Sequence, residues 1–404
     1  MIVTDSDVYW DPYDVEINTD PYPVFKRLRE EAPLYYNEGH DFYAVSRYPD
    51  VERGLRDRDT FISGRGVVLE IIKSGMEMPS GTVIFEDPPT HTIHRSLLSR
   101  MFTPRQVARL EPQIRHFCAD ALDPLVGLDR FDVIGELGAV MPARVIGMLM
   151  GLPDEDALDV RRRSGAGTRR VPAGGGYGGA QEGEMFATAF ERQISEFLDW
   201  RAEHPADDIM SELLTVEFED ETGTRRRLTR QEVGAYSSIV LGAGNETTTR
   251  LIGWFCKLLA EHPGQRRELV DDRSLVPQAI EEVLRFEPPA PVVARYVATD
   301  AGFQGQTVRA GSALLNLVGA ANRDGDKFAN AEEFDIHRGA SVSHLTFGFG
   351  AHFCLGAGLA RLEGRIALEE LLTRFPEWDV DLSAAKLEPI ALTRGWESLP
   401  LVIP

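Results

Sequence analysis

One cysteine near the end of the chain lies in the part of the sequence most able to do chemistry. Cys354 sits in the run 347–358, which reads Phe-Gly-Phe-Gly-Ala-His-Phe-Cys-Leu-Gly-Ala-Gly. Helical periodicity from Leu355 to about Phe375 predicts a helix directly after it. A thiolate at a helix N-terminus is stabilised by free backbone N–H groups and by the helix dipole. Because the thiolate is the form that binds metals, Cys354 is a candidate metal ligand.

The neighbours of the cysteine support this interpretation. Gly348, Gly350 and Gly356 lack a Cβ, so the backbone can turn tightly there and approach a flat group closely. Phe347 would shield the sulfur from water. The alternative is a buried structural cysteine, which is the commoner fate of a free thiol. The flanking pattern favours the role of a metal ligand for Cys354 over a structural role.

A second candidate site lies in the middle of a long predicted helix, from Thr229 to about Glu261. Thr229 and Glu232 form a capping box at its start. Its middle, 242–249, reads Gly-Ala-Gly-Asn-Glu-Thr-Thr-Thr, which costs about 2–4 kcal/mol relative to alanine. Poor helix formers in the middle of a helix indicate a functional site. An acid beside a hydroxyl, here Glu246 and Thr247, could move protons.

A third pattern is an acid–base pair on a short helix predicted from Pro277 to Phe286. Glu282 and Arg285 are three residues apart, so they share one face of this helix. Such a pair is usually a surface ion pair. The extended segment from Pro288 to Thr299 follows, and the Gly-punctuated stretch from 302 to 317 predicts further strands.

Composition excludes several classes of function. The 404 residues carry a net charge of −21, which argues against binding nucleic acid or anionic membranes. Three cysteines do not make a disulfide framework, and Cys118 and Cys256 are expected to be structural. The N-terminus has no signal-peptide pattern, and no window reaches about 18 uncharged apolar residues. We therefore expect a cytoplasmic protein without a membrane anchor.

Together these motifs resemble the cytochrome P450 superfamily of haem-thiolate monooxygenases. The cysteine run is similar to the family's axial-ligand signature, Ala243–Thr247 to its oxygen-activation motif, and Glu282–Arg285 to its Glu-x-x-Arg motif. The resemblance extends from about Asp20 to the end. It implies a mainly α fold with a smaller β region (α+β), with haem between the long central helix and the cysteine-ligand helix. We expect one domain over residues 1–404, and a monomer.

The resemblance also implies roles for individual residues. The cofactor would be haem b, with Cys354 as the iron ligand and Glu246 and Thr247 as the catalytic proton relay. Ala243 and Gly244 would leave room for dioxygen. Glu282 and Arg285 would be buried and structural; the arginine that usually joins them is replaced by Glu333, and Arg323 and Arg338 are both open as substitutes. The implied cofactor contacts are His91, Arg95, Ala243, Gly244, Arg295, Phe347, His352, Cys354 and Gly356.

The implied activity is insertion of one oxygen atom from O2 into a C–H bond of a hydrophobic small molecule. Electrons would come from NAD(P)H through ferredoxin reductase and ferredoxin, because no flavin or iron–sulfur domain is recognised here. A peroxide-driven peroxygenase and a non-catalytic haem-binding or gas-sensing protein are the alternatives. The acid–hydroxyl pair at Glu246 and Thr247 argues against both.

Three further expectations concern substrate and partner. Apolar residues are expected to wall the substrate pocket, favouring a lipid, terpenoid, steroid or aromatic; they are Val68, Leu69 and Ile72 in a predicted long loop (62–88), then Ala243, Val292, Val293, Leu392 and Thr393. The glycine-rich segment 165–179 is expected to be a lid. Five arginines in 91–116 (Arg95, Arg100, Arg105, Arg109 and Arg115) would suit an acidic ferredoxin, and the alternative is a solvated helix face.

Overall fold

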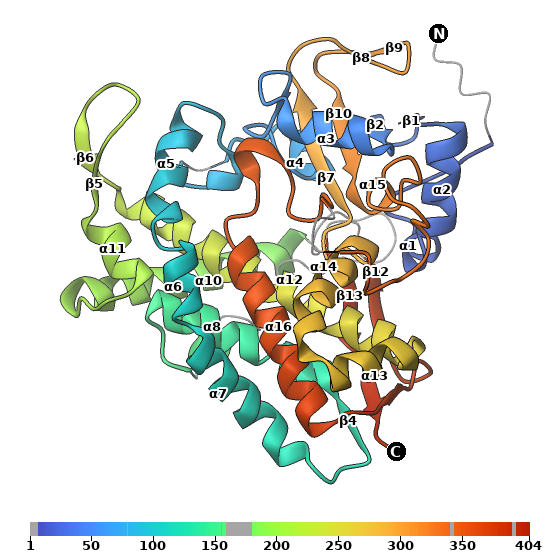
Figure 1. Ribbon diagram of the computed structural model, residues 1–404. Coiled ribbons are helices and arrows are strands. Elements are labelled where there is room, and N and C mark those ends of the chain that lie inside the picture. The colour runs from blue at the N-terminus through green and yellow to red at the C-terminus, as the bar shows by residue number, and fades with distance from the viewer. Residues whose placement is uncertain (1–6, 79, 155, 159–179, 340–342, 390–392) are drawn as a thin grey trace.

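The computed structural model describes residues 7–78, 80–154, 156–158, 180–339, 343–389 and 393–404. Helices dominate it, and the largest sheet lies at one end (Figure 1), which confirms the predicted mainly α fold with a smaller β region. The helices are α1 (Val15–Thr19), α2 (Tyr22–Glu31), α3 (Tyr48–Arg56), α4 (Leu69–Ser74), α5 (Thr90–Ser99), α6 (Pro104–Ala108), α7 (Glu111–Leu122), α8 (Met141–Met150), α10 (Ala180–Glu203), α11 (Ile209–Thr215), α12 (Arg230–Glu261), α13 (Pro263–Asp271), α14 (Val276–Phe286), α15 (Val318–Ala321) and α16 (Ala357–Arg374).

The largest sheet has five strands in the order β1-β2-β10-β7-β3, and all its neighbouring pairs except the parallel β2–β10 are antiparallel. The strands of the described chain are β1 (Leu34–Asn37), β2 (Phe42–Val45), β3 (Phe61–Ile62), β4 (Arg130–Asp132), β5 (Glu217–Glu219), β6 (Arg225–Arg227), β7 (Val292–Val297), β8 (Ala301–Phe303), β9 (Gln306–Val308), β10 (Ala313–Leu317), β11 (Asp379–Val380), β12 (Lys386–Pro389), β13 (Arg394–Ser398) and β14 (Pro400–Val402). Arg295 lies on β7, opposite Leu314 of β10.

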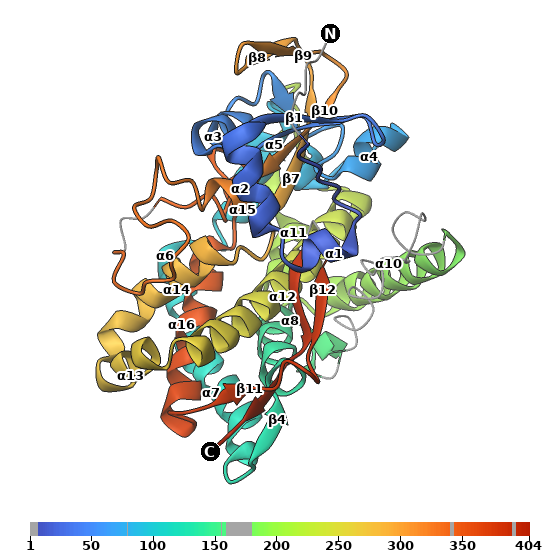
Figure 2. The same ribbon diagram turned by 90° about the vertical axis from the view of Figure 1, so that its right-hand side faces the viewer.

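The long helix α12 crosses the molecule and contacts α8, α14, α16 and β13 (Figure 2). The predicted capping box is present: the Thr229 side chain accepts from the Glu232 backbone, and Glu232 accepts from the Thr229 backbone. The helix has 32 residues and is α-helical throughout, including its glycine- and threonine-rich middle. Tertiary packing on several sides therefore outweighs the poor local propensity.

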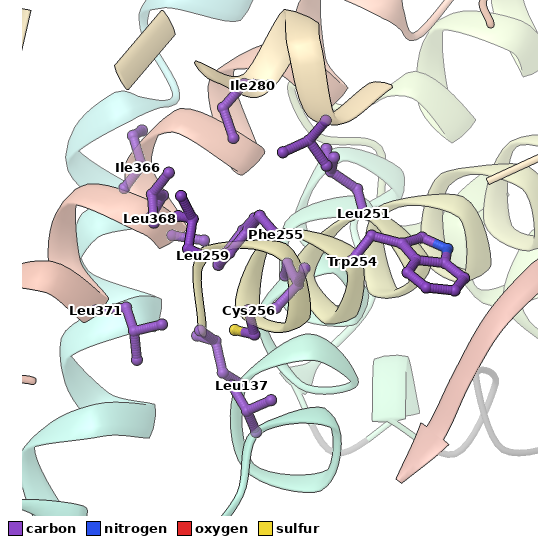
Figure 3. Packing of buried hydrophobic residues seen from close by; sticks show 14 of the residues in the cluster. Leu137, Leu251, Trp254, Phe255, Cys256, Leu259, Ile280, Ile366, Leu368 and Leu371 are labelled. Carbon is purple, nitrogen blue, oxygen red and sulfur yellow. The ribbon is translucent and has the colours of Figure 1, made fainter. Parts of the chain in front are cut away.

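The main core lies where α12 meets α14, α16 and the turn Ile134–Gly138 (Figure 3). Each buried leucine, isoleucine or phenylalanine there contributes roughly 1.5–3 kcal/mol. Cys118 and Cys256 are fully buried, as expected of structural cysteines, and burial raises the pKa of both thiols. The contributing side chains include Leu137, Leu251, Phe255, Leu259, Ile280, Ile366, Leu368 and Leu371.

The structure differs from the sequence-based expectations in two places. The segment predicted as a loop (62–88) contains α4, whose six residues are too few to show a helical period; it ends at Gly75, which adopts φ 67°. The helix after the cysteine begins at Ala357, two residues later than expected. The predicted lid (165–179) lies outside the described residues. Within the described chain, no helix combines the length and apolarity that a membrane span needs.

Candidate functional site

Cys354 lies in a tight loop immediately before α16. Gly348 and Gly350 have φ of 71° and 74°, a region that favours glycine, and a Cβ on Gly350 would come within 3.2 Å of the Arg56 Cα of α3. The backbone N–H of Cys354 donates to the Phe347 carbonyl at 2.7 Å. These constraints hold the cysteine at the helix N-terminus, where its predicted role needs it.

The electrostatic surroundings of Cys354 combine opposing effects. Its surface is exposed, yet nearby protein desolvates the thiol, and this raises its pKa. The backbone N–H groups of Gly356 and Ala357 and the guanidinium groups of Arg95 and Arg361 act in the other direction, by favouring the thiolate. A metal cation at the sulfur would favour the thiolate further.

Two aromatic rings flank the cysteine. Phe347 is 9% exposed, and the Arg361 guanidinium lies 4.4 Å from its ring centre. Phe353 is partly exposed, and its backbone carbonyl accepts a hydrogen bond from Arg95 of α5. The burial of Phe347 is compatible with its predicted shielding role.

Four cationic or hydrogen-bonding side chains gather near the loop. The rings of His91 and His352 lie 4.0 Å apart, and Arg295 is 4% exposed. Burial, followed by repulsion from Arg95, lowers the pKa of His91. Burial also lowers the pKa of His352 to about 3, with contributions from His91, Arg295 and Arg95, and that of Arg295 to about 10.

Several polar atoms of this cluster have no hydrogen-bond partner among the described residues. Among the described residues, both ring nitrogens of His91 and Nε2 of His352 are buried without a hydrogen-bond partner. The Arg295 guanidinium donates to the carbonyl of its neighbour, Ala294, at 2.9 Å. Buried donors of this kind require anionic or polar partners. Two carboxylates, which haem carries as propionates, fit the cluster.

On α12, Ala243 and Thr247 are one turn apart and share a face. The Thr247 hydroxyl donates to the Ala243 carbonyl at 3.0 Å, so its oxygen lone pairs remain available. Gly244 has a packing reason to be glycine, because a Cβ there would come within 3.0 Å of Ile146 on α8. Its predicted contact with the cofactor stays a prediction. The same holds for Gly356, where a Cβ would meet no described atom within 4 Å.

Glu246 is held by two donors. The Thr393 hydroxyl donates to its Oε1 at 2.8 Å, and Arg250 donates to the same oxygen at 3.2 Å. Thr393 was expected as a wall of the substrate pocket. Its hydroxyl takes part in a polar network with α12, and its place in the pocket wall stays a prediction.

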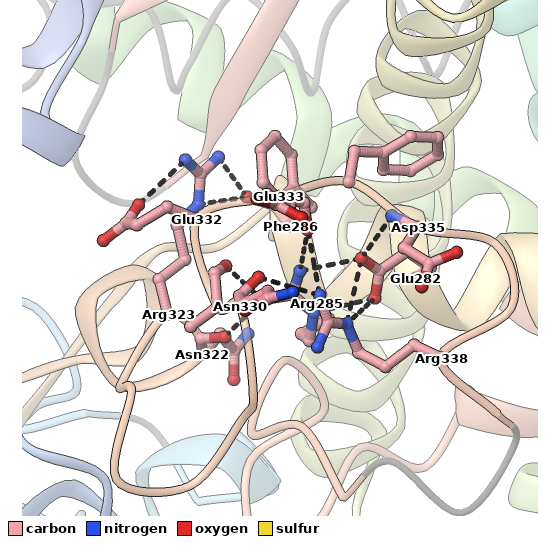
Figure 4. A network of polar contacts seen from close by, with 12 residues as sticks. Glu282, Arg285, Phe286, Asn322, Arg323, Asn330, Glu332, Glu333, Asp335 and Arg338 are labelled. Carbon is pink, nitrogen blue, oxygen red and sulfur yellow. Dashed lines mark hydrogen bonds and ion pairs between the residues drawn. The ribbon is translucent and has the colours of Figure 1, made fainter.

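Glu282 and Arg285 are buried and joined by two hydrogen bonds of 2.7 Å (Figure 4). Arg285 also donates to the carbonyls of Asn322, Ala331 and Glu333. The third member, left open by the sequence, is Arg338, whose Nε lies 3.2 Å from the Glu282 carboxylate. Arg323 instead pairs with Glu287 and Glu332.

The expected pocket residues do not all come together. Leu69, Ile72 and Val292 belong to one apolar cluster, with Val68 preceding α4. Val293 packs against a different cluster, because successive residues of a strand point to opposite faces. Leu392 lies outside the described residues.

Sequence reasoning missed Arg250 and Glu363. Arg250 bonds to Glu246, and Glu363 accepts a hydrogen bond from Thr248 at 3.0 Å while almost fully buried. The four-residue spacing of Glu246 and Arg250 places them on one helix face and could have predicted their ion pair. No local pattern indicates that Glu363 would be buried.

Comparisons with known proteins agree with this architecture. The family model described as Cytochrome P450 matches residues 181–390. A solved cytochrome P450 from Chondromyces apiculatus is 35% identical, covers 98% of both chains and superposes with a TM-score of 0.85. One from Bacillus megaterium in complex with testosterone is 29% identical, with 96% and 99% of the two chains covered and a TM-score of 0.85. A Vitamin D(3) 25-hydroxylase from Pseudonocardia autotrophica is 34% identical over 392 residues, 95% of this chain and 94% of its own.

The fold and site therefore define a haem enzyme of the oxygen-activating class. The chain belongs to the cytochrome P450 family. It is a monooxygenase of the bacterial type, and its cofactor is haem b.

Proposed function

We propose that Cys354 is the iron ligand of a monooxygenase that inserts one oxygen atom from O2 into a C–H bond of a hydrophobic small molecule. The observation that carries this proposal is the arrangement of the cysteine loop beside buried polar side chains that have no hydrogen-bond partner among the described residues. The loop offers a sulfur before α16, and the donors suit two carboxylates. Haem is one flat molecule that carries an iron for the sulfur and two propionate carboxylates for the cluster.

Each residue then has a defined task. Bound haem supplies the activation of dioxygen, which a thiolate ligand favours by donating electron density. Cys354 provides that ligand, while His91, Arg95, Arg295 and His352 hold the propionates. Phe347 keeps water from the sulfur.

Proton delivery falls to α12. Thr247 keeps its hydroxyl fixed through Ala243, with lone pairs free to accept a hydrogen bond. Glu246, whose side chain is 23% exposed, can exchange protons with solvent and pass them toward Thr247. Ala243, with its small side chain, leaves space beside that hydroxyl.

The substrate we propose is a steroid or secosteroid, within the broader class of hydrophobic small molecules. Two relatives support this choice: one is named a Vitamin D(3) 25-hydroxylase, and one was solved with testosterone. Apolar side chains at Leu69, Ile72 and Val292 are compatible with such a substrate.

Electrons are proposed to come from NAD(P)H through ferredoxin reductase and ferredoxin. Arg100, Arg105 and Arg109 are exposed and form no ion pair with a described carboxylate. Arg115 is different, because Glu111, Glu369 and Glu370 already surround it. The three free arginines lie on or beside α5 and α6, and Arg95 links α5 to the cysteine loop.

The ligand assignment is tested by replacing the cysteine. The haem-loaded protein, reduced under carbon monoxide, should show the absorption band of thiolate-ligated haem. Cys354→Ala should lose this band, whereas Cys256→Ala, at another lone cysteine, should keep it. A band that survives in Cys354→Ala contradicts the proposal.

The substrate and the electron donor are tested with the same protein. Testosterone, vitamin D3, a monoterpene, a fatty acid and a polycyclic aromatic are titrated while the Soret band is followed. We expect the largest shift from the first two, and turnover with ferredoxin, its reductase and NADPH. Turnover with peroxide alone would favour the peroxygenase alternative, and no Soret shift with either steroid would contradict the substrate class.

A further inference from the structure

The acid of the α12 motif is fixed by residues that lie outside the motif. Thr393, just before β13, donates its hydroxyl to Oε1 of Glu246 at 2.8 Å. Arg250, one turn further along α12, donates to the same oxygen at 3.2 Å. No described residue bonds to Oε2. One carboxylate oxygen is therefore held, and the other is free to take up or release a proton.

Arg250 is itself anchored to the β12–β13 hairpin. It is 5% exposed, and it donates to the Trp396 carbonyl at 2.9 Å and to the Glu388 carboxylate. Gly395 makes room for it, since a Cβ there would lie 2.5 Å from the Arg250 Cδ and 2.9 Å from its Cβ. The guanidinium cannot follow Glu246 freely, because the hairpin fixes its other contacts.

We propose that Thr393 and Arg250 are positioning residues, which hold Glu246 through Oε1 and leave Oε2 for proton delivery. This inference rests on the proposed relay role of Glu246. It places control of proton delivery partly in the β12–β13 hairpin, more than 130 residues from the acid in the chain. Neither residue passes a proton itself: the arginine stays charged, and the threonine hydroxyl donates to the held oxygen.

The test is a double-mutant cycle on the haem-loaded protein, with ferredoxin, reductase, NADPH and the steroid that gives the largest Soret shift. Thr393→Val removes one hydroxyl while keeping the side-chain shape. We expect product formed per NADPH to fall about five- to tenfold, the effect of losing one charge-assisted hydrogen bond, with peroxide released instead. Thr393→Ser should restore coupling, because it restores the donor.

The cycle then asks whether Thr393 acts through Glu246. In a Glu246→Gln background, Thr393→Val should cause little further loss, whereas an independent effect would add in full. The Soret-derived dissociation constant of the steroid should be the same in wild type and Thr393→Val. A crystal structure of Thr393→Val should show the Glu246 carboxylate displaced. Thr373→Val, which removes an exposed hydroxyl bonded to a backbone carbonyl on α16, is the matched control and should change none of these.

The outcomes separate the two proposals. If Glu246→Gln leaves coupling unchanged, the relay role of Glu246 fails and this inference with it. If Glu246→Gln uncouples turnover but Thr393→Val does not, only the positioning role is overturned. Additive losses in the double variant, or weaker steroid binding in Thr393→Val, overturn it as well, because Thr393 would then act as a pocket residue.

Discussion

At the scale of single residues, Glu363 is a buried carboxyl with a raised pKa. It lies on α16, is 2% exposed, and accepts one hydrogen bond, from Thr248 of α12. Burial raises the pKa of this carboxyl to about 8, and the hydrogen bond from Thr248 acts in the opposite direction. Near neutral pH the folded protein therefore holds Glu363 mostly as the neutral acid.

This elevated pKa predicts how stability depends on pH. The folded state binds a proton that the unfolded state has released between about pH 4.5 and pH 8, so the contribution of Glu363 to the free energy of unfolding falls as pH rises through that window. The expected slope is about 1.4 kcal/mol per pH unit. Glu363→Gln cannot ionise and should lose this slope, so its melting temperature should gain on wild type steadily from pH 5 to pH 8. Parallel curves for the two proteins would contradict the raised pKa.

The sequence identified the residues that local motifs mark, and it did not identify their distant partners. Cys354, Glu246 and Glu282 stand in short patterns that can be found by eye. Arg338 meets Glu282 across 56 positions, and Glu388 meets Arg250 across 138. Contacts of that kind depend on how helices and hairpins pack, which no short window contains.

At the scale of elements, the helices that could be predicted from the sequence are those that are long or begin with a recognisable N-terminal signal. The helix α12 was predicted because a capping box opens it, and α14 because Pro277 stands in its first turn. The helix α4 was missed because six residues carry little period, and the Val68 side chain does not cap it. The sequence predicted the Glu282–Arg285 pair on α14 but not its third member. The usual arginine position is occupied by Glu333, and the choice between Arg323 and Arg338 needed the structure.

Because Arg338 links Glu282 of α14 to the loop before the cysteine, its removal should lower the stability of the protein. Arg338 pairs with Glu282 and donates to the carbonyls of Asn330 and Glu333, so Arg338→Ala leaves a buried carboxylate with fewer donors and frees the loop. We expect a loss of about 2–4 kcal/mol in the free energy of unfolding, measured by denaturant titration.

A surface arginine provides the comparison for this variant. The Arg309 side chain is 79% exposed and pairs with Asp300. Arg309→Ala should therefore change the free energy of unfolding by about 0.5 kcal/mol or less. Arg338→Lys should fall between the two, because lysine keeps the charge and loses the planar set of donors. Equal stabilities for Arg338→Ala and Arg309→Ala would show that Arg338 is not a structural tie.

At the scale of the whole molecule, charge is distributed unevenly. The net charge is −21, yet Arg100, Arg105 and Arg109, on or beside α5 and α6, form no ion pair with a described carboxylate, and we call these three arginines the basic patch. Arg95, also on α5, donates to the cysteine loop. An acidic protein that carries a local basic patch repels acidic partners elsewhere and attracts them there. The patch is therefore the docking surface that we propose for an acidic electron donor.

Reversing the patch should slow electron delivery. Arg100→Glu/Arg109→Glu should lower the rate of reduction by ferredoxin on the order of tenfold at low salt, measured by stopped-flow absorbance, and the difference should shrink as salt screens the charges. Arg309→Glu/Lys386→Glu changes the net charge by the same amount outside α5 and α6, and should have a much smaller effect. If the two double variants slow reduction equally, total charge and not the patch governs the encounter, and an unchanged rate at low salt in Arg100→Glu/Arg109→Glu rules the patch out as the docking surface.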